Sequence, residues 1–531
     1  MNTLCCLNGK VWTLDPGCPV AEAVVTKQNL IAYVGSTAEA RRVAGGGARV
    51  VDLGGRLMLP GFIDAHTHLV QGGFQLQGID LRGCRSGEEF VQRIASYVQA
   101  HPGGAWVTGG DWDHEAWKPR GLPRMEWIDP ATPTTPVLVQ RLDGHMALAN
   151  SAALGRAGIT RATSDPPGGI IERDPHTGEP TGILKDAAMN LIASAIPPPT
   201  ETQIAGALER AMRHALRNGV TSVQDITAGE HLGVFQTFEK ERRLQVRIYT
   251  RLPISEVDQL VARGIRHAHG TDLLKTGSLK AFADGSLGSG TALFFEPYLD
   301  EPSRAGLAMD IVTDGRLRHW ALEADAHGLQ LSVHAIGDRA IHIVLSLFEE
   351  IAATNPPWDR RFRIEHAQHV RPGDLERFRR LGVIVSAQPY HCIDDGVWAE
   401  KRIGTERAQT TYAFRSFMEA GVPVCFGSDW TVAPMDPIAG IYAAATRRTL
   451  DGAHPGGWIP RERVSVEDAV RAYTLGGAYA AYEERAKGSI EVGKLADLVV
   501  LSRDILTMEP ERLREAEVDM TVFDGRVVYE R

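Results

Sequence analysis

Two histidines, His66 and His68, stand two residues apart in the stretch 61–69, which follows the short apolar run 57–60. We interpret this stretch as the carboxyl end of a strand. Side chains at i and i+2 of a strand point to the same face, so two imidazoles at this spacing can bind one metal ion. A pair of surface histidines would have the same spacing, so the pair alone is a weak indication.

Later apolar segments end in further side chains with metal-binding chemistry. Imidazole and carboxylate ligands together favour zinc, with Mn, Fe or Co as alternatives. We therefore predict a divalent metal site, with zinc favoured and one or two ions per chain. Its predicted ligands are His66, His68, Lys280, His334, His366 and Asp429.

Lys280 and Asp429 each have an alternative role. An ammonium group cannot bind a metal, so Lys280 becomes a ligand only if its amine loses a proton and captures CO₂ as a carbamate. Otherwise Lys280 forms an ion pair with Asp284 or another acid. Lys185 would then be the alternative lysine ligand for the metal. Asp429 could instead cap a helix, because aspartate is a favoured N-cap residue. We predict the metal role for both Lys280 and Asp429.

The elements that must position these residues follow an alternating pattern. Eight strands alternating with helices predict an α/β fold, a TIM-like (β/α)₈ barrel whose carboxyl strand ends carry the site. After the first strand, the predicted strands are 220–224, 245–250, 278–282, 329–334, 362–366, 383–387 and 422–426. The clearest predicted helices are 87–100, 201–218, 316–327 and 340–354.

Segments rich in short strands lie at both ends of the chain. Neither end is long enough to bury a core alone, so we predict one composite β-domain from residues 1–58 and 485–531, with two separate caps as the alternative. The barrel then spans 59–484. About 150 residues separate its first and second strands, far more than a βα unit needs, which predicts an inserted subdomain at about 105–190, over the barrel mouth.

Composition excludes several classes of protein. The 531 residues carry a net charge of −9, with acidic and basic residues interspersed, which argues against nucleic acid or an anionic membrane as the main partner. The sequence contains no apolar run of membrane-spanning length and no secretory signal. The six scattered cysteines form no disulfide framework, so we expect a cytoplasmic protein. A dinucleotide fingerprint and a serine-hydrolase elbow are also absent.

The chain resembles the amidohydrolase superfamily, in particular its YtcJ-like branch, which includes N-substituted formamide deformylases. The matching motifs are 60–68, 280–289, 333–338, 363–369, 427–430 and 493–500. The resemblance implies a distorted (β/α)₈ barrel with a β-sandwich domain formed by both termini, and a metal site made by the histidines and Asp429. Lys280 matches the position of a carboxylated lysine that bridges two metals. Thr431 departs from the expected Pro, at a position that is not a ligand.

These parts predict a metal-dependent hydrolase of an amide-like C–N bond, such as that of an N-substituted formamide. A metal lowers the pKa of its bound water and so supplies hydroxide for attack on a carbonyl carbon. Asp429 is the predicted catalytic residue that carries the proton to the leaving nitrogen. The same site could hydrolyse a carbamate or an ester, or deaminate, and a non-catalytic regulatory relative is a third interpretation. Retention of all six ligands argues against the last.

Three residues are predicted to contact the small-molecule substrate. His145 resembles a motif histidine of the YtcJ-like branch, and we expect it to donate to the substrate carbonyl as a second catalytic residue; a structural role is the alternative. Trp112 and Trp430 are predicted to form an apolar wall, or else to pack in a core.

Two carboxylates are predicted to support the ligands from behind. Asp338 is expected to orient His334, and Asp284 to shape the loop around Lys280. A homodimer, or else a larger assembly, is expected from other barrels of this type.

Overall fold

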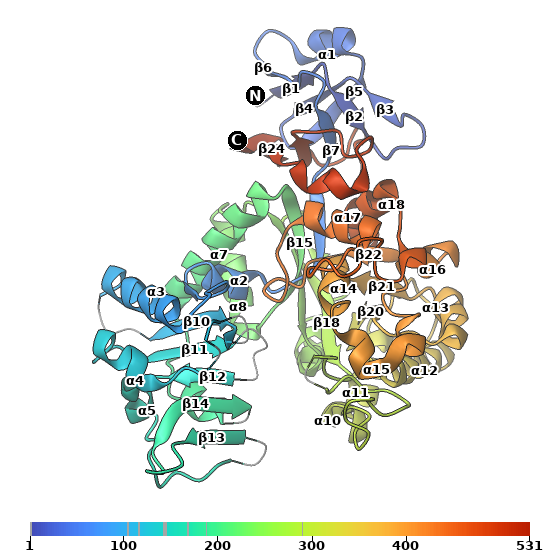
Figure 1. Ribbon diagram of the computed structural model, residues 1–531. Helices are drawn as coiled ribbons and strands as arrows, with labels where there is room; N and C mark the ends of the chain where they lie inside the picture. Colours follow the sequence, from blue (N-terminus) through green and yellow to red (C-terminus); the bar gives the residue numbers. More distant parts are fainter. Residues whose placement is uncertain are drawn as a thin grey trace. The chain divides into compact units, whose positions relative to one another are not determined.

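The computed structural model describes residues 3–102, 106–114, 117–119, 121–141, 146–166, 169–186, 188–288 and 290–531. The chain divides into two compact units (Figure 1). Unit 1 contains Met1–Leu69 and Leu208–Arg531, and unit 2 contains Val70–Ala207. The insert predicted at about 105–190 falls within unit 2.

Unit 1 contains the predicted barrel. Eight described strands pair in parallel, each with the next, in the order in which they occur along the chain. They are β8 (Phe62–Thr67), β15 (Val220–Ile226), β16 (Arg247–Pro253), β18 (Leu274–Phe282), β19 (Gln330–Ala335), β20 (Arg363–His366), β21 (Ile384–Ala387) and β22 (Val424–Phe426). A short strand, β17 (His269–Gly270), pairs with β18 in antiparallel fashion. The prediction of a (β/α)₈ barrel is confirmed.

The first barrel strand begins later than the sequence indicated. The apolar run Leu57–Pro60 forms β7, which belongs to another sheet, and the barrel strand is Phe62–Thr67. The chain changes sheets at Gly61, whose N–H donates to the Asp497 carbonyl at 2.9 Å, whereas the next N–H, of Phe62, donates to Gly219 in the barrel at 3.0 Å. His66 therefore lies within a barrel strand and not beyond it.

The barrel closes where the segment after β22 meets β8. The Asp429 N–H donates to the His66 carbonyl at 2.7 Å, and the His68 N–H donates to the Trp430 carbonyl at 2.8 Å. Gly427 permits this approach, because a Cβ there would lie 2.4 Å from the His66 nitrogen and 2.8 Å from Asp64 Oδ1. Two predicted ligands, on the first and last strands, are thus joined by the backbone bonds that close the barrel.

Helices follow the barrel strands. In α12, buried apolar residues recur every three or four positions, which gives the helix one face to pack on the sheet. The barrel helices are α7 (Glu201–Arg217), α8 (Gly229–Lys240), α9 (Val257–Ala262), α10 (Asp310–Thr313), α11 (Arg316–Ala326), α12 (Asp338–Thr354), α13 (Leu375–Leu381), α14 (Pro389–Asp395), α15 (Ala399–Ala408), α16 (Phe414–Glu419), α17 (Pro437–Thr446), α18 (Val466–Arg471) and α19 (Gly477–Ala480).

Strands from both termini form two further sheets in unit 1, seen as the blue and red strands that lie together in Figure 1. One sheet has the order β5-β4-β1-β6, and the other β25-β24-β23-β7-β2-β3. Their bounds are β1 (Thr3–Leu7), β2 (Lys10–Trp12), β3 (Val20–Ala21), β4 (Ala23–Lys27), β5 (Leu30–Gly35), β6 (Arg49–Asp52), β23 (Leu498–Leu501), β24 (Val518–Phe523) and β25 (Arg526–Glu530), with helix α1 (Thr37–Ala44) after β5.

The two terminal sheets share one hydrophobic core. Leu4 and Val24 of the first sheet and Met58, Leu498 and Val522 of the second belong to the same buried cluster. Because β7 pairs with β23 in antiparallel fashion, neither terminus forms its sheet alone. The expected β-sandwich from both termini is therefore present, and the alternative of two separate caps is wrong.

Unit 2 has its own sheet, with the described strand order β13-β14-β12-β11-β10-β9. These strands are β9 (Ile79–Asp80), β10 (Val107–Trp112), β11 (Val137–Arg141), β12 (Met146–Ala149), β13 (Gly169–Arg173) and β14 (Pro180–Asp186). The helices of this part of the chain are α2 (Leu69–Gln75), α3 (Gly87–Ala100), α4 (Met125–Ile128), α5 (Ser151–Arg156) and α6 (Met189–Ala193).

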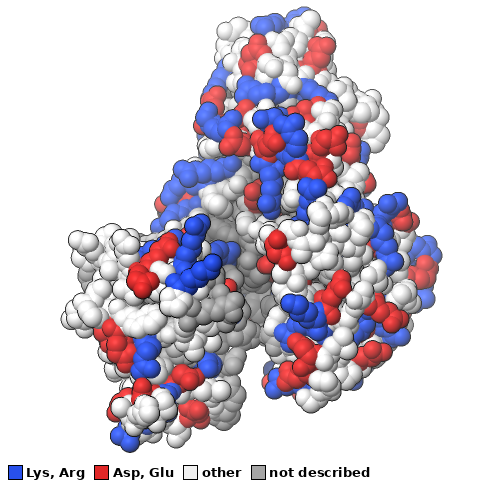
Figure 2. Space-filling view, viewed as in Figure 1, with Lys and Arg blue, Asp and Glu red and all other residues white. Residues whose placement is uncertain are grey.

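The face of the protein in Figure 2 carries acidic and basic side chains intermingled, as their distribution along the sequence indicates. Within the described part of the chain, none of the helices combines the length and the apolar character that a bilayer crossing requires.

We predict that Gly427→Ala destabilises the protein by roughly 1–3 kcal/mol, because the added Cβ forces β22 away from β8. Thermal unfolding followed by circular dichroism measures the loss. Gly233→Ala is the matched control: it lies in α8 with nothing within 4 Å of the added Cβ, so stability there is unchanged or higher. An unchanged melting temperature for Gly427→Ala would contradict this account of barrel closure.

Candidate metal centre

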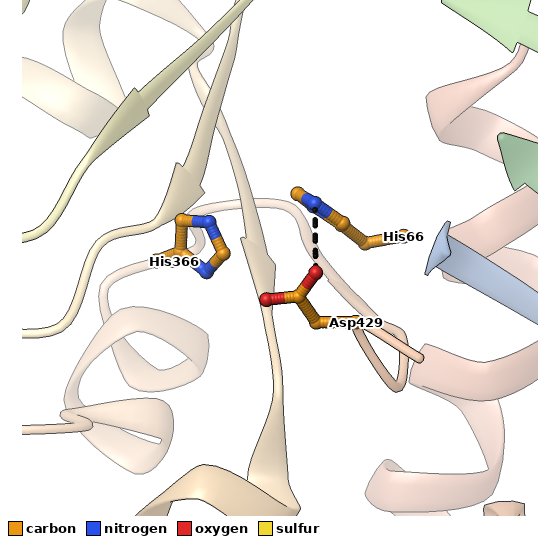
Figure 3. Close-up of side chains that lie close together, drawn as sticks. All are labelled: His66, His366 and Asp429. Atoms are coloured by element: carbon orange, nitrogen blue, oxygen red, sulfur yellow. Dashed lines mark ion pairs between the residues drawn. The ribbon is translucent and has the colours of Figure 1, made fainter. Parts of the chain in front are cut away.

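Three buried side chains converge at the carboxyl ends of the barrel strands. His66 comes from β8, His366 from the end of β20, and Asp429 from the turn after β22 (Figure 3). One ligand atom of each lies within 4.8 Å of the others. Their exposed fractions are 1%, 5% and 7%, so little solvent surrounds the group.

Neighbouring side chains fix which ring nitrogens carry protons. His66 Nδ1 lies 2.5 Å from Glu365 Oε2, a carboxylate that can only accept, so Nδ1 is the protonated nitrogen. His366 Nδ1 lies 2.7 Å from Gln388 Oε1, and the Gln388 amide nitrogen donates to the Ser386 carbonyl, which fixes the direction of the amide. Each ring therefore keeps an unprotonated Nε2.

The lone pairs on these ring nitrogens indicate whether the site suits a metal ion. His66 Nε2 lies 3.5 Å from Asp429 Oδ1, so an unprotonated nitrogen faces a carboxylate oxygen with no hydrogen between them. Two such nitrogens and one carboxylate form an electron-rich cluster that a divalent cation would stabilise. Neutral imidazole and carboxylate are also the ligands that zinc and similar metals prefer. The residues present fit a metal ion.

Two more predicted ligands lie beside this group. His68 Nε2 is 3.3 Å from the same Oδ1 of Asp429. The His334 ring lies 4.5 Å from the His366 ring, centroid to centroid, and its Nε2 is 3.0 Å from the Gly285 carbonyl, which leaves Nδ1 free of a proton. The structure thus gathers all four predicted histidines and Asp429 at one place.

Lys280 on β18 has an unusual environment. It is 3% exposed, and its Nζ has no hydrogen-bond partner among the described residues. Nζ lies 4.4 Å from the centre of the Phe282 ring. Burial lowers the pKa of the Lys280 amine to about 7, although Glu365 acts in the opposite direction. A large part of the amine population is therefore uncharged near neutral pH.

Burial and neighbouring charge hold the histidines and Asp429 in their ligating forms. Burial lowers the pKa of His66 to about 3 and that of His366 well below its usual value. Burial would raise the pKa of Asp429, but His66 and the other histidines hold it well below its usual range. At neutral pH the His66 and His366 imidazoles are therefore neutral and the Asp429 carboxylate is ionised, as metal binding requires.

Two ligand positions have uncommon backbone conformations. His366 has φ 71° and Asp429 has φ 56°, in the left-handed region that non-glycine residues seldom occupy. Such conformations cost on the order of 1–3 kcal/mol each and cluster at functional sites. Here they turn two side chains toward His66 at the points where their strands end.

Sequence reasoning did not identify four polar residues that hold the ligands. Glu365 and Gln388 contact His66 and His366, as described above. Asp64 accepts the His66 N–H at 3.1 Å and the Ser428 hydroxyl at 2.5 Å, which ties β8 to the turn that carries Asp429. Asp225 accepts the Leu69 N–H at 2.7 Å, directly after His68. Asp64 and Glu365 stand within two residues of a predicted ligand along the chain. This closeness is the one feature of the sequence that could have pointed to them.

Another residue that the sequence did not reveal is His391, on α14 after β21. It is 8% exposed, and its ring lies 6.4 Å from the His366 ring at an interplanar angle of 14°. Its Nε2 has no hydrogen-bond partner among the described residues. It is therefore a buried polar group beside the ligands that is available to a bound molecule.

The two predicted supporting carboxylates have different outcomes. Asp284 lies 3.4 Å from His334 Nε2 and accepts the N–H groups of Leu293 and Gly337, so it shapes the loop after Lys280. Among the described residues, Asp338 forms no hydrogen bond or ion pair with His334, and its role in orienting that ring stays a prediction. Asp338 instead accepts the Phe295 N–H at 2.9 Å at the start of α12.

The predicted substrate-contacting residues are placed as follows. His145 lies outside the described residues. Trp112 is fully buried in the core of unit 2, where its Nε1 donates to the Val139 carbonyl at 2.9 Å. Trp430 is 4% exposed, and its ring stacks on His214 of α7 at 4.9 Å. Both indoles pack against protein here, and their contact with a substrate stays a prediction.

A model of the amidohydrolase family matches residues 49–529. The chain belongs to this family. It is 39% identical to Protein LONG AFTER FAR-RED 3 of Arabidopsis thaliana, over 93% of this chain and 86% of the relative. It is 32% identical to the putative amidohydrolase YtcJ of Bacillus subtilis, over 98% of both chains. These matches confirm the resemblance to the YtcJ-like branch.

Two further similar proteins bear on chemistry. The N-substituted formamide deformylase of Arthrobacter pascens is 29% identical, over 100% of this chain and 99% of the relative. The solved structure of an uncharacterized metal-dependent hydrolase from Pyrococcus furiosus is 30% identical, with a TM-score of 0.79, over 95% of this chain and 100% of that chain.

The pKa of His66 predicts how this amidohydrolase responds to acid. His66 stays neutral in the folded state down to about pH 3, whereas an unfolded histidine binds a proton near its ordinary value of 6.5. The unfolded state therefore binds more protons below pH 6.5, and stability falls as the pH is lowered toward 3. From pH 7 to pH 5, His66 alone accounts for about 2 kcal/mol of this loss.

Urea unfolding of metal-free protein at both pH values measures this contribution. Metal-free His66→Gln is expected to lose about 2 kcal/mol less than the wild type between pH 7 and pH 5. Equal losses in the two proteins would show that His66 is not held neutral by the fold.

Proposed function

We propose that this protein is a metal-dependent hydrolase that cleaves an amide-like C–N bond, with N-substituted formamides or related small amides as substrates. The observation that carries the proposal is the meeting of two unprotonated imidazole nitrogens with an ionised carboxylate at the barrel mouth (Figure 3). The activity named for the Arthrobacter pascens relative supports the choice of bond. The description of the Pyrococcus furiosus structure supports dependence on a metal.

His66, His366 and Asp429 are the residues that would hold a first ion, and zinc is the metal that this donor set favours. His68 and His334 lie beside them and would complete this ion's ligands or hold a second. A bound divalent metal supplies Lewis acidity, which activates a water molecule and polarises a carbonyl oxygen. The protein supplies the fixed positions of the ligands.

Asp429 is placed to move the proton of the reaction. Its carboxylate is ionised, because the neighbouring histidines hold its pKa well below the usual range. One of its oxygens lies between His66 and His68, at 3.5 and 3.3 Å from their Nε2 atoms. Asp429 therefore accepts a proton from the attacking water and returns it to the leaving nitrogen, which departs as a neutral amine. His391 is available to contact the substrate from the segment that follows the neighbouring strand β21.

Lys280 is proposed to carry CO₂ as a carbamate. Its buried amine has no partner among the described residues and a pKa of about 7, so the uncharged, nucleophilic form is well populated. Arg251 and Arg363 lie near the Lys280 amine, where their positive charges disfavour its protonated form and would attract an anion formed on it. The amine nitrogen bonds to the carbon of CO₂ and loses one proton, which leaves a carbamate that can bridge two ions.

The carbamate predicts a carbon signal that depends on Lys280. Metal-loaded protein equilibrated with ¹³C-bicarbonate is expected to show a carbamate resonance, and Lys280→Met is expected to lack it. Lys185→Met is the matched control and keeps the signal, because Lys185 pairs with Glu172 in unit 2 at 2.7 Å. Two results would contradict the carbamate: a wild type that lacks the resonance, or a resonance that persists in Lys280→Met. Lys280 would then have only a structural role.

The proposed activity is tested with zinc- or manganese-loaded protein and a panel of N-substituted formamides, longer N-acyl amines, carbamates and esters. Release of formate or another acid, together with the amine, is measured for each compound. Asp429→Asn is expected to lower kcat/KM by about 10²–10⁴ on any compound that the wild type cleaves, because an amide cannot carry the proton.

Asp374→Asn is the control for this substitution, since Asp374 is a buried carboxylate that pairs with Arg377 and His342 outside the site. It is expected to keep wild-type turnover. A metal-loaded wild type that cleaves none of the panel would contradict the proposed function and favour a non-catalytic role.

A further inference from the structure

A second layer of charged side chains lies directly behind the metal ligands. Glu365, on β20 next to His366, is fully buried. Its Oε2 lies 2.5 Å from His66 Nδ1. Its Oε1 lies 2.8 Å from Arg251 Nη1, 2.9 Å from Arg363 Nε and 2.7 Å from the Ser332 hydroxyl. One carboxylate thus joins strands β8, β16, β19 and β20 inside the barrel.

This arrangement is unusual for a barrel interior, which is ordinarily filled with branched apolar side chains. Burying three charged groups carries a desolvation cost that their mutual attraction seldom exceeds. Apolar residues of similar volume would therefore fill the same space with equal or greater stability. Stability alone does not account for Glu365.

The partners of Glu365 hold its carboxylate in one orientation. Arg251 Nη2 also donates to the Gln224 carbonyl at 2.7 Å, and Arg363 Nη2 donates to the Ala65 carbonyl at 2.9 Å. Both guanidinium groups are anchored to the backbone of other barrel strands, Arg251 to β15 and Arg363 to β8. They occupy Oε1, and Oε2 remains directed at His66.

We propose that Glu365 is a positioning residue that acts on the metal through His66. Its carboxylate accepts the proton on Nδ1, so His66 stays in the tautomer that presents an unprotonated Nε2 toward Asp429. The negative charge behind the ring also makes Nε2 a stronger donor to a metal. Glu365 does not touch the substrate, and the inference rests on the metal site of the proposed function but not on its substrate.

Glu365→Gln tests this role, because glutamine keeps the shape and one accepting oxygen while the charge is lost. The affinity of the metal-free protein for Zn²⁺, measured by competition with a chromophoric chelator, is expected to fall about 10–100-fold. The absorption bands of the Co²⁺-loaded protein are expected to shift, because one ligand to the metal becomes a weaker donor. Neither readout requires a substrate.

Asp497→Asn is the matched control. Asp497 is a buried carboxylate directly before β23 that pairs at 2.6 Å with Arg247, which begins β16 away from the metal ligands. Breaking this ion pair removes a comparable buried charge, so the melting temperature falls. The affinity for Zn²⁺ and the Co²⁺ spectrum are expected to stay as in the wild type.

Ser332→Ala keeps the inference testable if Glu365→Gln does not fold. It removes one hydrogen bond to Glu365 Oε1 and leaves the charge in place, so a smaller loss of Zn²⁺ affinity is expected in a folded protein. Wild-type affinity in Ser332→Ala would then overturn the inference.

Other outcomes separate this inference from the proposed function. Wild-type Zn²⁺ affinity in folded Glu365→Gln, or an equal loss in Asp497→Asn, would overturn the role of Glu365 alone. A wild type that binds Zn²⁺ but cleaves no compound would overturn the proposed hydrolase and leave Glu365 as a positioning residue. A wild type that binds no metal would overturn both.

Discussion

One electrostatic constraint governs the structure of the site. Unprotonated imidazole nitrogens lie close to an ionised carboxylate, and all of these groups are buried. His66 Nε2 and Asp429 Oδ1 lie 3.5 Å apart with no proton to share, and His366 lies within the same 4.8 Å group. These groups repel one another in a low-dielectric interior unless a cation lies among them. The fold maintains this arrangement through the hydrogen bonds that close the barrel and through two residues with positive φ.

Two layers of the barrel therefore have different tasks. At the strand ends, the ligands face one another and can bind an ion. One layer deeper, Glu365, Arg251 and Arg363 form a charged group that sets the protonation of His66. The composite domain from the two termini is attached below through the buried Arg247–Asp497 ion pair. The candidate metal ligands at one end of the barrel and the structural contacts at the other follow the usual division of labour in this fold.

The sequence was sufficient to predict the barrel strands and the side chains that meet at their ends, and insufficient to predict the residues that support those side chains. Alternating apolar segments predicted the eight strands, and the rule that barrel sites lie at carboxyl strand ends singled out His66, His68, His334, His366 and Asp429. The contact between Glu365 and His66 joins residues 299 positions apart, and no local pattern encodes it. The sequence did not locate the border between β7 and the first barrel strand, because the chain changes sheets within one residue, at Gly61. The burial of Trp112 and Trp430 likewise depends on tertiary neighbours that residue type does not reveal.

The most direct measurement of the central claim is the anomalous scattering of a crystal grown with Zn²⁺, recorded on both sides of the zinc absorption edge. We expect a peak about 2.0–2.2 Å from His66 Nε2, His366 Nε2 and an oxygen of Asp429, with any second peak toward His334 and Lys280. A crystal in which zinc appears only at surface residues, or in which His66 binds the metal through Nδ1, would contradict it.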